Sequence, residues 1–329
     1  MSAYLFVHFR EKITPDGEQV HFALSRDGFV WESVHEGLPV LWTYYGCRGA
    51  RDFTICRCEN KFHIIATDPS LAYGMRNEYR GSWDAISRHG SRYLAHWESD
   101  DLVHWSEQRL LSIGCEDFGC MWAPEITYDR NQRDYVLHWS SSHRADDYQQ
   151  KAIYYSRTRD FTSFTPPRLL FRKTDSGVID SAMAEENGQY YLFVKSEGNP
   201  EKLIMLRSDS ITGPFERMEA FDESMADCQS GLYEAPTIVR LEDGRWCLFI
   251  DYYGVRGKGQ GYIPYLTDDL SSGRFVRAGS SRADGKDDGP AAFSFPYGFK
   301  HGTILPITDE EYERIRSHDW HSDQFEANP

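Results

Sequence analysis

The sequence predicts an all-β protein, a five-bladed β-propeller, from a short phrase that recurs among strand-like segments. Each copy joins an acidic residue to an aromatic residue a few positions later. The five copies cover residues 25–31, 99–105, 157–164, 207–215 and 266–275. Strands and turns that repeat at the intervals separating these copies are typical of propellers. Because a propeller directs one side chain of each blade toward its axis, we expect acidic side chains there.

The repeats account for nearly the whole chain, so we expect one domain spanning residues 1–329. No Ser/Gly linker or low-complexity stretch marks an internal boundary. Aromatic residues make up 15% of the sequence, which suits strands and packing between blades. Aromatic rings also provide stacking surfaces for sugars.

The formal net charge of −15 argues against nucleic-acid and anionic-membrane partners, since both need a basic surface. No apolar run has the length of a transmembrane helix, and residues 1–10 lack the basic flank of a secretory signal. None of the seven cysteines shows metal-ligand spacing, and Cys56 and Cys58 should face the same side of one strand. We therefore expect free thiols and a cytoplasmic location.

Short aromatic and β-branched segments, bounded by polar or glycine-bearing turns, predict the strands. They cover residues 4–9, 20–25, 62–67, 135–140, 152–157, 190–196, 203–208 and 246–251. Residues 308–317 predict a helix with Thr308 as its N-cap.

We expect each blade to begin with an inner strand, continue with two middle strands and end with an outer strand that finishes at the repeated phrase. Four inner strands are predicted from Ala50, Trp122, Val178 and Tyr233. Residues 299–308 would form the fifth, paired with the first strands of the chain. This closure would remove the free edge of an open ring.

Each of the four internal inner strands carries an acid within an apolar run near its start. These acids are Asp52, Glu125, Asp180 and Glu234. A buried carboxylate is costly unless it has partners or a task. At like positions of converging strands, the four acids should share one pocket and shift each other's pKa values apart. Such a pocket can supply the acid and the base of glycoside hydrolysis.

Three of these segments resemble glycoside hydrolase family 43, a family of five-bladed propellers that includes arabinofuranosidases and xylosidases. The segments are Arg51-Asp52-Phe53, Ile179-Asp180-Ser181 and Glu234-Ala235-Pro236. The resemblance implies that Asp52 is the general base, that Asp180 orients the acid and raises its pKa, and that Glu234 is the general acid. Phe53 departs from the proline that usually follows the base.

Two further segments carry the same resemblance. Trp122-Ala123-Pro124-Glu125 resembles a Trp-Ala-Pro-Asp segment of the family, which implies that Glu125 is a wall residue of the pocket. His301 resembles the axial histidine near which many members hold a calcium or sodium ion, so a structural ion is expected there, and no cofactor is required. The invertase-type Asn-Asp-Pro-Asn-Gly and Glu-Cys segments are absent from the sequence, which argues against a retaining fructosidase.

The expected function is an exo-acting, inverting glycoside hydrolase of the α-L-arabinofuranosidase type that releases a terminal sugar from small oligosaccharides. Arg51 and Trp122 are predicted to contact the sugar. The loops 68–93 and 277–293 are expected to shape the rim of the pocket. Three alternatives remain: β-xylosidase or galactofuranosidase specificity, a glycoside phosphorylase with a cationic phosphate subsite, and a sugar-binding propeller without catalysis.

Overall fold

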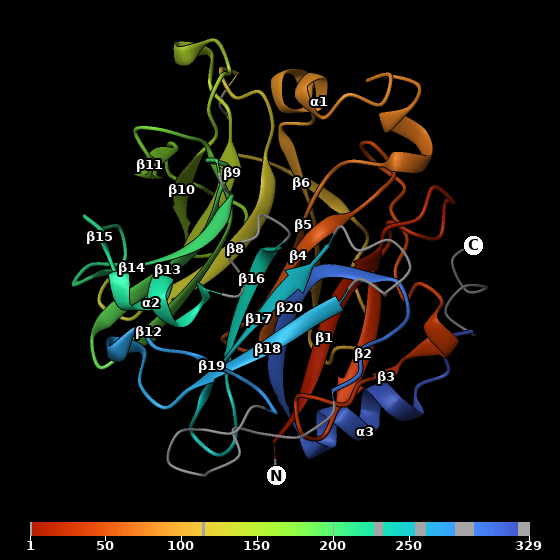
Figure 1. Cartoon of the computed structure of the whole chain (residues 1–329). Helices are drawn as coiled ribbons and strands as arrows, with labels where there is room; N and C mark the ends of the chain where they lie inside the picture. Colours follow the sequence, from red (N-terminus) through yellow and green to blue (C-terminus); the bar gives the residue numbers. More distant parts are fainter. Residues whose placement is uncertain are drawn as a thin grey trace.

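The computed structural model describes residues 2–113, 116–199, 201–226, 233–253, 261–279 and 293–321. These residues form five four-stranded sheets, and every pairing within the sheets is antiparallel (Figure 1). The first strands of the sheets contact one another in a closed cycle, β4 to β8, β12, β16, β20 and back to β4. The predicted five-bladed propeller is confirmed.

Four blades use four consecutive strands each. They are β4 (Arg51–Cys58), β5 (Lys61–Thr67), β6 (Tyr93–Ser99) and β7 (Arg109–Ser112); β8 (Trp122–Asp129), β9 (Asp134–Ser141), β10 (Ala152–Thr158) and β11 (Arg168–Phe171); β12 (Val178–Glu186), β13 (Gln189–Ser196), β14 (Lys202–Ser208) and β15 (Glu216–Arg217); and β16 (Tyr233–Arg240), β17 (Trp246–Tyr252), β18 (Gly261–Thr267) and β19 (Val276–Arg277). The inner strands predicted from the sequence are β4, β8, β12 and β16.

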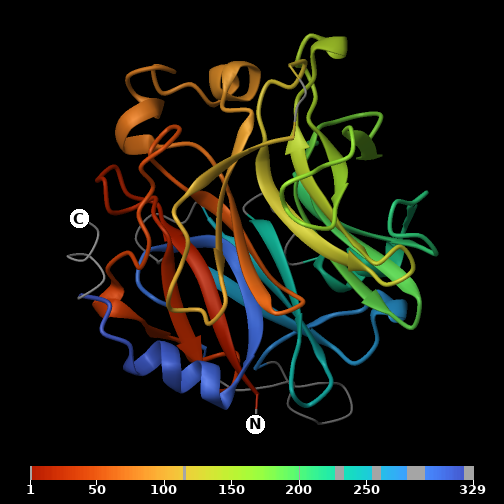
Figure 2. The ribbon, with the colours of Figure 1, turned by 180° about the vertical axis from the view of Figure 1, so that it is seen from behind.

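The fifth blade combines both ends of the chain. It contains β20 (Phe299–Thr308), β1 (Ser2–Arg10), β2 (His21–Ser25) and β3 (Glu32–Ser33) in that order. Tyr4 on β1 stands opposite Pro306 on one side and Ser25 on the other. Figures 1 and 2 show the red β1 and the blue β20 side by side. Because β1 and β20 pair with each other, the edges that they share are hydrogen-bonded and not free.

Short helices connect or cover the blades. They are η1 (His35–Gly37), the π-helix η2 (Leu71–Met75), α1 (Trp83–His89), η3 (Arg144–Asp146), α2 (Glu219–Ser224), η5 (Leu270–Ser272) and α3 (Asp309–Ser317). Thr308 caps α3 through a capping box with Glu311, as its sequence predicts. Arg57 of β4 binds the same Glu311 through two hydrogen bonds of 2.7 and 2.9 Å, which ties α3 to the neighbouring blade. None of the described helices combines the length and the apolar character needed to cross a membrane.

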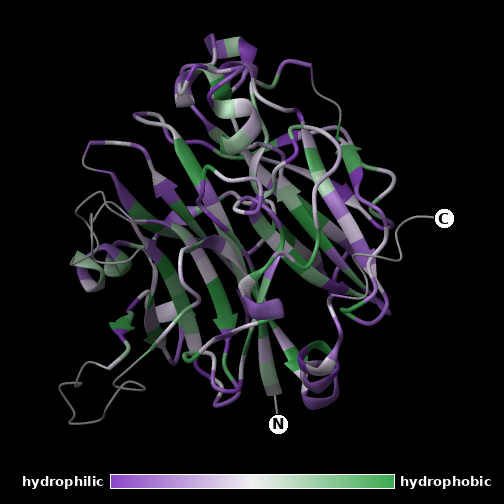
Figure 3. Ribbon diagram, turned by 90° about the vertical axis from the view of Figure 1, so that its right-hand side faces the viewer, coloured by the Kyte–Doolittle hydropathy of each residue, from purple (hydrophilic) through white to green (hydrophobic). Residues whose placement is uncertain are grey.

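The hydrophobic core consists of five clusters, and each cluster joins the facing sides of two neighbouring blades. Trp97 of β6 and Trp139 of β9 are among its largest fully buried side chains. Hydrophobic segments lie along the strands in Figure 3, whereas many peripheral loops are hydrophilic. Most of the buried aromatic residues therefore pack between blades, which leaves the hub free for polar side chains.

The repeated acidic phrase does not supply the acids of the axis, and it does not end the outer strand. It forms the turn between the third and fourth strands of each blade. Asp27 accepts hydrogen bonds from the backbone N–H groups of Phe29 and Val30, and Asp101 does the same for Val103 and His104. Aspartate is favoured here because its short side chain can satisfy the backbone of its own turn.

The described cysteines Cys47, Cys56, Cys58, Cys120 and Cys247 are free thiols. The sulfur atoms of Cys56 and Cys58 lie 2.8 Å apart, on the same side of β4. This arrangement follows from the two-residue period of a strand.

Replacing Gly302 with alanine should destabilise the pairing of the two chain ends. A Cβ atom at this position would collide with the carbonyl oxygen of Val7 on β1. We expect Gly302→Ala to lower the free energy of unfolding by about 1–3 kcal/mol or more, measured by urea denaturation. Gly74→Ala is the control, because its Cβ would meet no atom closer than 3.9 Å. Equal unfolding free energies of the two variants would contradict the expectation.

Candidate active site

The four internal inner strands bulge at the same level of the propeller. Their register against the next strand shifts between Arg51 and Thr54, between Trp122 and Glu125, between Ile179 and Ser181, and between Glu234 and Thr237. One residue in each bulge has a left-handed backbone. The φ angles are 51° at Asp52, 46° at Ala123, 52° at Asp180 and 54° at Ala235. Bulges of this kind redirect side chains and are common beside active sites.

Hydrogen bonds between neighbouring blades hold three of these left-handed residues. The N–H of Ala123 donates to the hydroxyl of Thr67 at 2.8 Å, and the N–H of Asp180 donates to the hydroxyl of Ser140 at 3.0 Å. The N–H of Ala235 donates to the carboxylate of Asp180 at 3.2 Å. A left-handed conformation is costly for residues with a Cβ, so it persists where such contacts fix it.

The bulges show that the four predicted acids do not occupy like positions. Asp52 and Asp180 are themselves the left-handed residues, whereas Glu234 precedes the left-handed Ala235 and Glu125 follows Ala123 by two residues. The offset has a consequence because side chains alternate between the faces of a strand. Three acids face one cavity, and Glu125 is not among the described residues that line it.

The cavity has a volume of about 660 Å³, within the range of small-molecule sites. Asp52, Asp180 and Glu234 line it together with the predicted sugar contacts Arg51 and Trp122. The remaining lining residues are Phe9, Glu11, Thr67, Pro69, Trp83, Asp84, Ser87, Tyr148, Gln149, Lys151, Ile179, Glu197, Tyr253, Lys300 and His301.

The loop 68–93 contributes to this wall, as expected, through Pro69 and through Trp83, Asp84 and Ser87 of α1. Trp83 stands edge-on to Trp122, with ring centroids 6.2 Å apart. Within the other predicted rim loop, 277–293, residues 280–292 lie outside the described part of the chain.

Asp52 is poised as an ionised carboxylate. Burial alone would raise its pKa, but the hydrogen bond and charge of His301, the charge of Arg51 and the hydroxyl of Thr67 outweigh burial and lower the pKa below its usual value. The carboxylate lies 3.3 Å from Nδ1 of His301. A carboxylate in this state can accept a proton from water.

Asp180 and Glu234 show the reverse of the electrostatics predicted from the sequence. The sequence predicts that Asp180 raises the pKa of Glu234, but the pKa of Glu234 is lowered. Burial would raise it, yet Lys300 and Lys195 lie within 3.1 and 3.3 Å of its carboxylate oxygens. Asp180 has the raised pKa instead, about 7, because of its burial and the nearby charges of Glu234 and Asp52. The two carboxyls therefore titrate as a pair that retains a proton near neutrality.

The predicted sugar contacts are both held by neighbours. Arg51 binds Glu18 at 2.7 Å, so its guanidinium enters the cavity wall as a paired cation. Trp122 is partly exposed and has the ammonium of Lys151 5.4 Å from its ring centroid. Its stacking on a sugar stays a prediction.

Glu125 lies further along β8, near the hydroxyl groups of Thr54 and Thr303. Burial raises its pKa to about 8, so the group is largely protonated at neutral pH. The predicted position of Glu125 in the pocket wall is therefore not found among the described lining residues. The cause is the bulge at Ala123, which shifts the register of every residue after it.

His301 lies near the axis, but its neighbours do not form a closed metal site. Burial disfavours the imidazolium, yet Asp52, Asp180 and Glu234 raise the pKa of His301 to about 9. The ring therefore supplies a positive charge itself. Within the described ranges, His301 belongs to no group of three His, Cys, Asp or Glu ligand atoms lying within 4.8 Å of one another. An ion bound there would depend on water for most of its ligands.

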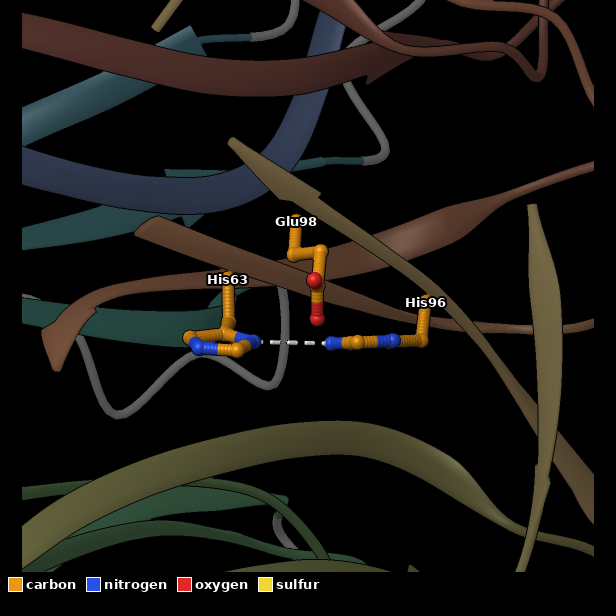
Figure 4. Close-up of side chains that lie close together, drawn as sticks. All are labelled: His63, His96 and Glu98. Atoms are coloured by element: carbon orange, nitrogen blue, oxygen red, sulfur yellow. Dashed lines mark hydrogen bonds between the residues drawn. The ribbon is translucent and has the colours of Figure 1, made fainter. Parts of the chain in front are cut away.

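A second set of potential metal ligands lies away from the cavity, on β5 and β6. It contains His63, His96 and Glu98 (Figure 4). Nδ1 of His96 accepts from Arg109 at 3.1 Å, so Nε2 carries the proton and donates to Nδ1 of His63 at 3.0 Å. Glu98 is neutralised by Lys61 at 2.7 Å. These contacts describe a hydrogen-bonded histidine pair, since a metal-bound histidine would need an acceptor at its other nitrogen.

The residues that sequence reasoning missed are the partners of the acids: Thr67, Ser140, Lys195, Asp251 and Lys300. A signal was present for some of them. Lys195 and Asp251 end otherwise apolar strands, and Lys300 precedes the axial His301. All three are buried, and a buried polar group needs a partner.

Replacing Ser140 with alanine should loosen the site without removing a group that lines it. The backbone N–H of Asp180 would lose its acceptor, the hydroxyl of the fully buried Ser140. An unsatisfied buried donor costs about 1–3 kcal/mol, so we expect a loss of unfolding free energy in that range. The exposed Ser112→Ala is the matched control. An unchanged midpoint of thermal unfolding for Ser140→Ala would show that this contact does not hold the bulge.

Solved structures share this architecture, and three of them serve as examples. A xylan β-1,4-xylosidase from Bacillus halodurans C-125 has a TM-score of 0.56 at 16% identity, over 82% of this chain and 51% of that chain. A family 43 protein from Bacillus licheniformis has a TM-score of 0.57 at 12% identity, over 93% and 60%. An α-L-arabinofuranosidase from Podospora anserina, solved with cellotriose, has a TM-score of 0.52 at 15% identity, over 73% and 71%. At these identities the likeness concerns the fold.

Sequence comparison adds a curated relative and a family. An α-L-arabinofuranosidase of Bifidobacterium longum subsp. longum is 28% identical over 218 residues, which cover 60% of this chain. The chain spans only 20% of the length of that relative. A family model described as a probable glycosyl hydrolase domain, related to glycoside hydrolase family 43, matches residues 1–313. The chain belongs to this family of probable glycosyl hydrolase domains.

Proposed function

We propose that the protein is an exo-acting, inverting glycoside hydrolase of the α-L-arabinofuranosidase type that releases a terminal sugar from small oligosaccharides. The observation that carries the proposal is the convergence of Asp52, Asp180 and Glu234 on one cavity, where their surroundings lower the pKa of Asp52 and raise that of Asp180. One ionised carboxylate and one carboxyl pair that retains a proton are the base and the acid that glycosidic bond cleavage needs.

In the proposed reaction Asp52 takes a proton from a water molecule, which attacks the anomeric carbon. The paired cations His301 and Arg51 keep Asp52 ionised and hold its orientation. Inversion follows if the water attacks from the face opposite the leaving group. The chemistry uses carboxyl groups of the chain and requires no cofactor.

Glu234 protonates the departing glycosidic oxygen. Asp180 supports this role in two ways. Its carboxylate binds the N–H of Ala235 at 3.2 Å, which fixes the backbone next to Glu234, and its charge opposes the ionisation of Glu234. A proton retained by the pair near neutrality is available to the leaving group.

A small substrate suits the dimensions of the cavity. A volume of about 660 Å³ fits a terminal sugar and its neighbour better than a long polymer. The rings of Trp83, Trp122 and Tyr253 line it and offer stacking surfaces. These features favour removal of sugars from chain ends.

The charges of the cavity give less support to a phosphorylase. A phosphate subsite would need cations that are available to an anion. Each described lysine or arginine of the wall already has a carboxylate partner: Arg51 has Glu18, Lys151 has Glu197 at 2.8 Å, and Lys300 has Asp251 at 2.9 Å.

A screen of nitrophenyl furanosides and pyranosides tests the proposed activity. We expect turnover of α-L-arabinofuranoside, independent of phosphate, and ¹H NMR should detect the inverted anomer first. Turnover that requires phosphate would favour the phosphorylase, and sugar binding without turnover would favour the binding propeller. Preference for a β-xyloside would move the specificity to the xylosidase alternative.

Replacing Glu234 with glutamine should slow the reaction according to the leaving group. A natural disaccharide needs a protonated leaving oxygen, so we expect kcat/KM to fall by about 10²–10⁴-fold. An activated dinitrophenyl glycoside should lose far less, because its leaving group departs without a proton. The comparison of kcat/KM on both substrates is the measurement, and near-normal turnover of the disaccharide would refute the role of Glu234.

The pH profile should be bell-shaped, with its high-pH limb near neutrality. On the low-pH limb, kcat/KM rises with pH as Asp52 loses its proton. Because the pKa of Asp52 is lowered, this limb should lie below the pH at which an ordinary aspartate titrates. At higher pH it falls as the Asp180–Glu234 pair loses its proton, at about pH 7, which is the pKa of Asp180.

The Asp180→Asn variant distinguishes this origin of the high-pH limb from others. Without the negative charge of Asp180, the lysines lower the pKa of Glu234 unopposed, so the limb should move to lower pH. A limb that stays in place in Asp180→Asn would assign it to another group.

A further inference from the structure

Two lysines from different blades form ion pairs with the carboxylate of Glu234. Nζ of Lys300, on β20, lies 3.1 Å from Oε1, and Nζ of Lys195, on β13, lies 3.3 Å from Oε2. Each oxygen therefore has its own ammonium group. The side chains of Lys300 and Lys195 are only 3% and 6% exposed, so water screens these contacts little.

Lys300 is anchored from behind by a buried carboxylate. Asp251 of β17 is 0% exposed and lies 2.9 Å from Nζ of Lys300. Asp251 also stands directly across the strand pair from Glu234. A buried charge without a partner is very unfavourable, so Asp251 fixes Lys300 at this place.

Lys195 is anchored by two groups on its other side. Nζ donates to the hydroxyl of Tyr253 at 2.7 Å and lies 3.0 Å from the carboxylate of Glu201. Tyr253 in turn donates to Glu201 at 3.0 Å. Neither lysine can leave Glu234 without breaking contacts that are already formed.

We propose that Lys195 and Lys300 are positioning residues that set the orientation and the acid strength of Glu234. The inference rests on the proposed role of Glu234 as proton donor. Two cations fixed on a carboxyl make it a stronger acid, which transfers its proton more readily to a poor leaving group. Near neutral pH the proton of the pair is held by Asp180, whose pKa burial raises to about 7, and Glu234 delivers it to the leaving group.

The charged and titratable groups that face Glu234 come from five elements or their ends. They are Asp52 on β4, Asp180 on β12, Lys195 on β13, Asp251 and Tyr253 at the end of β17, and Lys300 and His301 on β20. Burial raises the pKa of Glu234, and Lys300, Lys195 and His301 lower it more strongly. Removing either lysine therefore has a defined sign: Glu234 becomes a weaker acid and keeps its proton to higher pH.

The Lys195→Met variant tests this sign. We expect the high-pH limb of kcat/KM to move up by about one pH unit or more. On the plateau, turnover of a disaccharide should fall while turnover of a dinitrophenyl glycoside is kept, because only the former depends on acid strength. Lys195→Arg is the matched control, since it keeps the charge and should retain the limb of the unmodified protein.

A second variant approaches Glu234 from the other side. Lys300→Met combined with Asp251→Asn removes both charges of the buried pair, so no lone charge stays in the core. An upward movement of the limb is expected, smaller than in Lys195→Met because the loss of the Asp251 charge acts in the opposite direction. If both variants fold and turn over substrate like the wild type and the high-pH limb of kcat/KM stays in place in both, the proposal is overturned. An equal movement of the limb in Lys195→Arg would also overturn it.

A direct titration separates this inference from the proposed function. Carboxyl ¹³C NMR, with the Glu234 signal assigned by its loss in Glu234→Gln, reports the pKa of Glu234 without any turnover. A pKa that rises by about one unit or more in Lys195→Met supports the lysines even if no glycoside is cleaved. An unchanged pKa refutes them even if the enzyme is active.

Discussion

The site depends on one backbone constraint, a bulge at the same level of each internal inner strand. A regular strand would alternate its side chains between two faces, and none of the acids would be turned by a left-handed residue. The bulges give Asp52 and Asp180 positive φ angles. In three of the four bulges, the N–H of the left-handed residue donates to a hydroxyl or carboxylate of a neighbouring blade. The backbone of the candidate site therefore takes its shape only when the ring is assembled. A blade out of place would release the bulge of its neighbour.

Charge compensation is the second constraint, and it explains why three acids can share one cavity. Asp52 has His301 and Arg51, Glu234 has Lys195 and Lys300, and Asp180 has the smallest share of positive charge. The proton therefore settles where cations are scarcest. An uneven distribution of cations creates the difference between the proposed base and the proposed acid, although all the groups are simple carboxyls.

Much of this arrangement could be predicted from the sequence. The period of the repeats gave the blade number, and the apolar runs around Asp52, Asp180 and Glu234 indicated that these acids face the interior. The bulges were not predictable, because the acids lie within apolar runs, in which a one-residue shift of the alternation between the two faces leaves no trace in the sequence. Because the bulge at Ala123 is not visible in the sequence, Glu125 was predicted to line the pocket. The lysines were missed because a lysine at a strand end is usually exposed, and only the converging blades bury Lys195.

The closing blade joins stability to function. Its inner strand β20 is the last strand among the described residues, pairs with β1, and supplies both Lys300 and His301. Until that pairing forms, the carboxylates of the other inner strands lack these two cations and repel one another. The seam thus removes two open strand edges and delivers positive charge to an acidic hub in the same step. Closing a ring across the whole chain costs conformational entropy, and attraction between β20 and the acids of the hub offsets part of that cost.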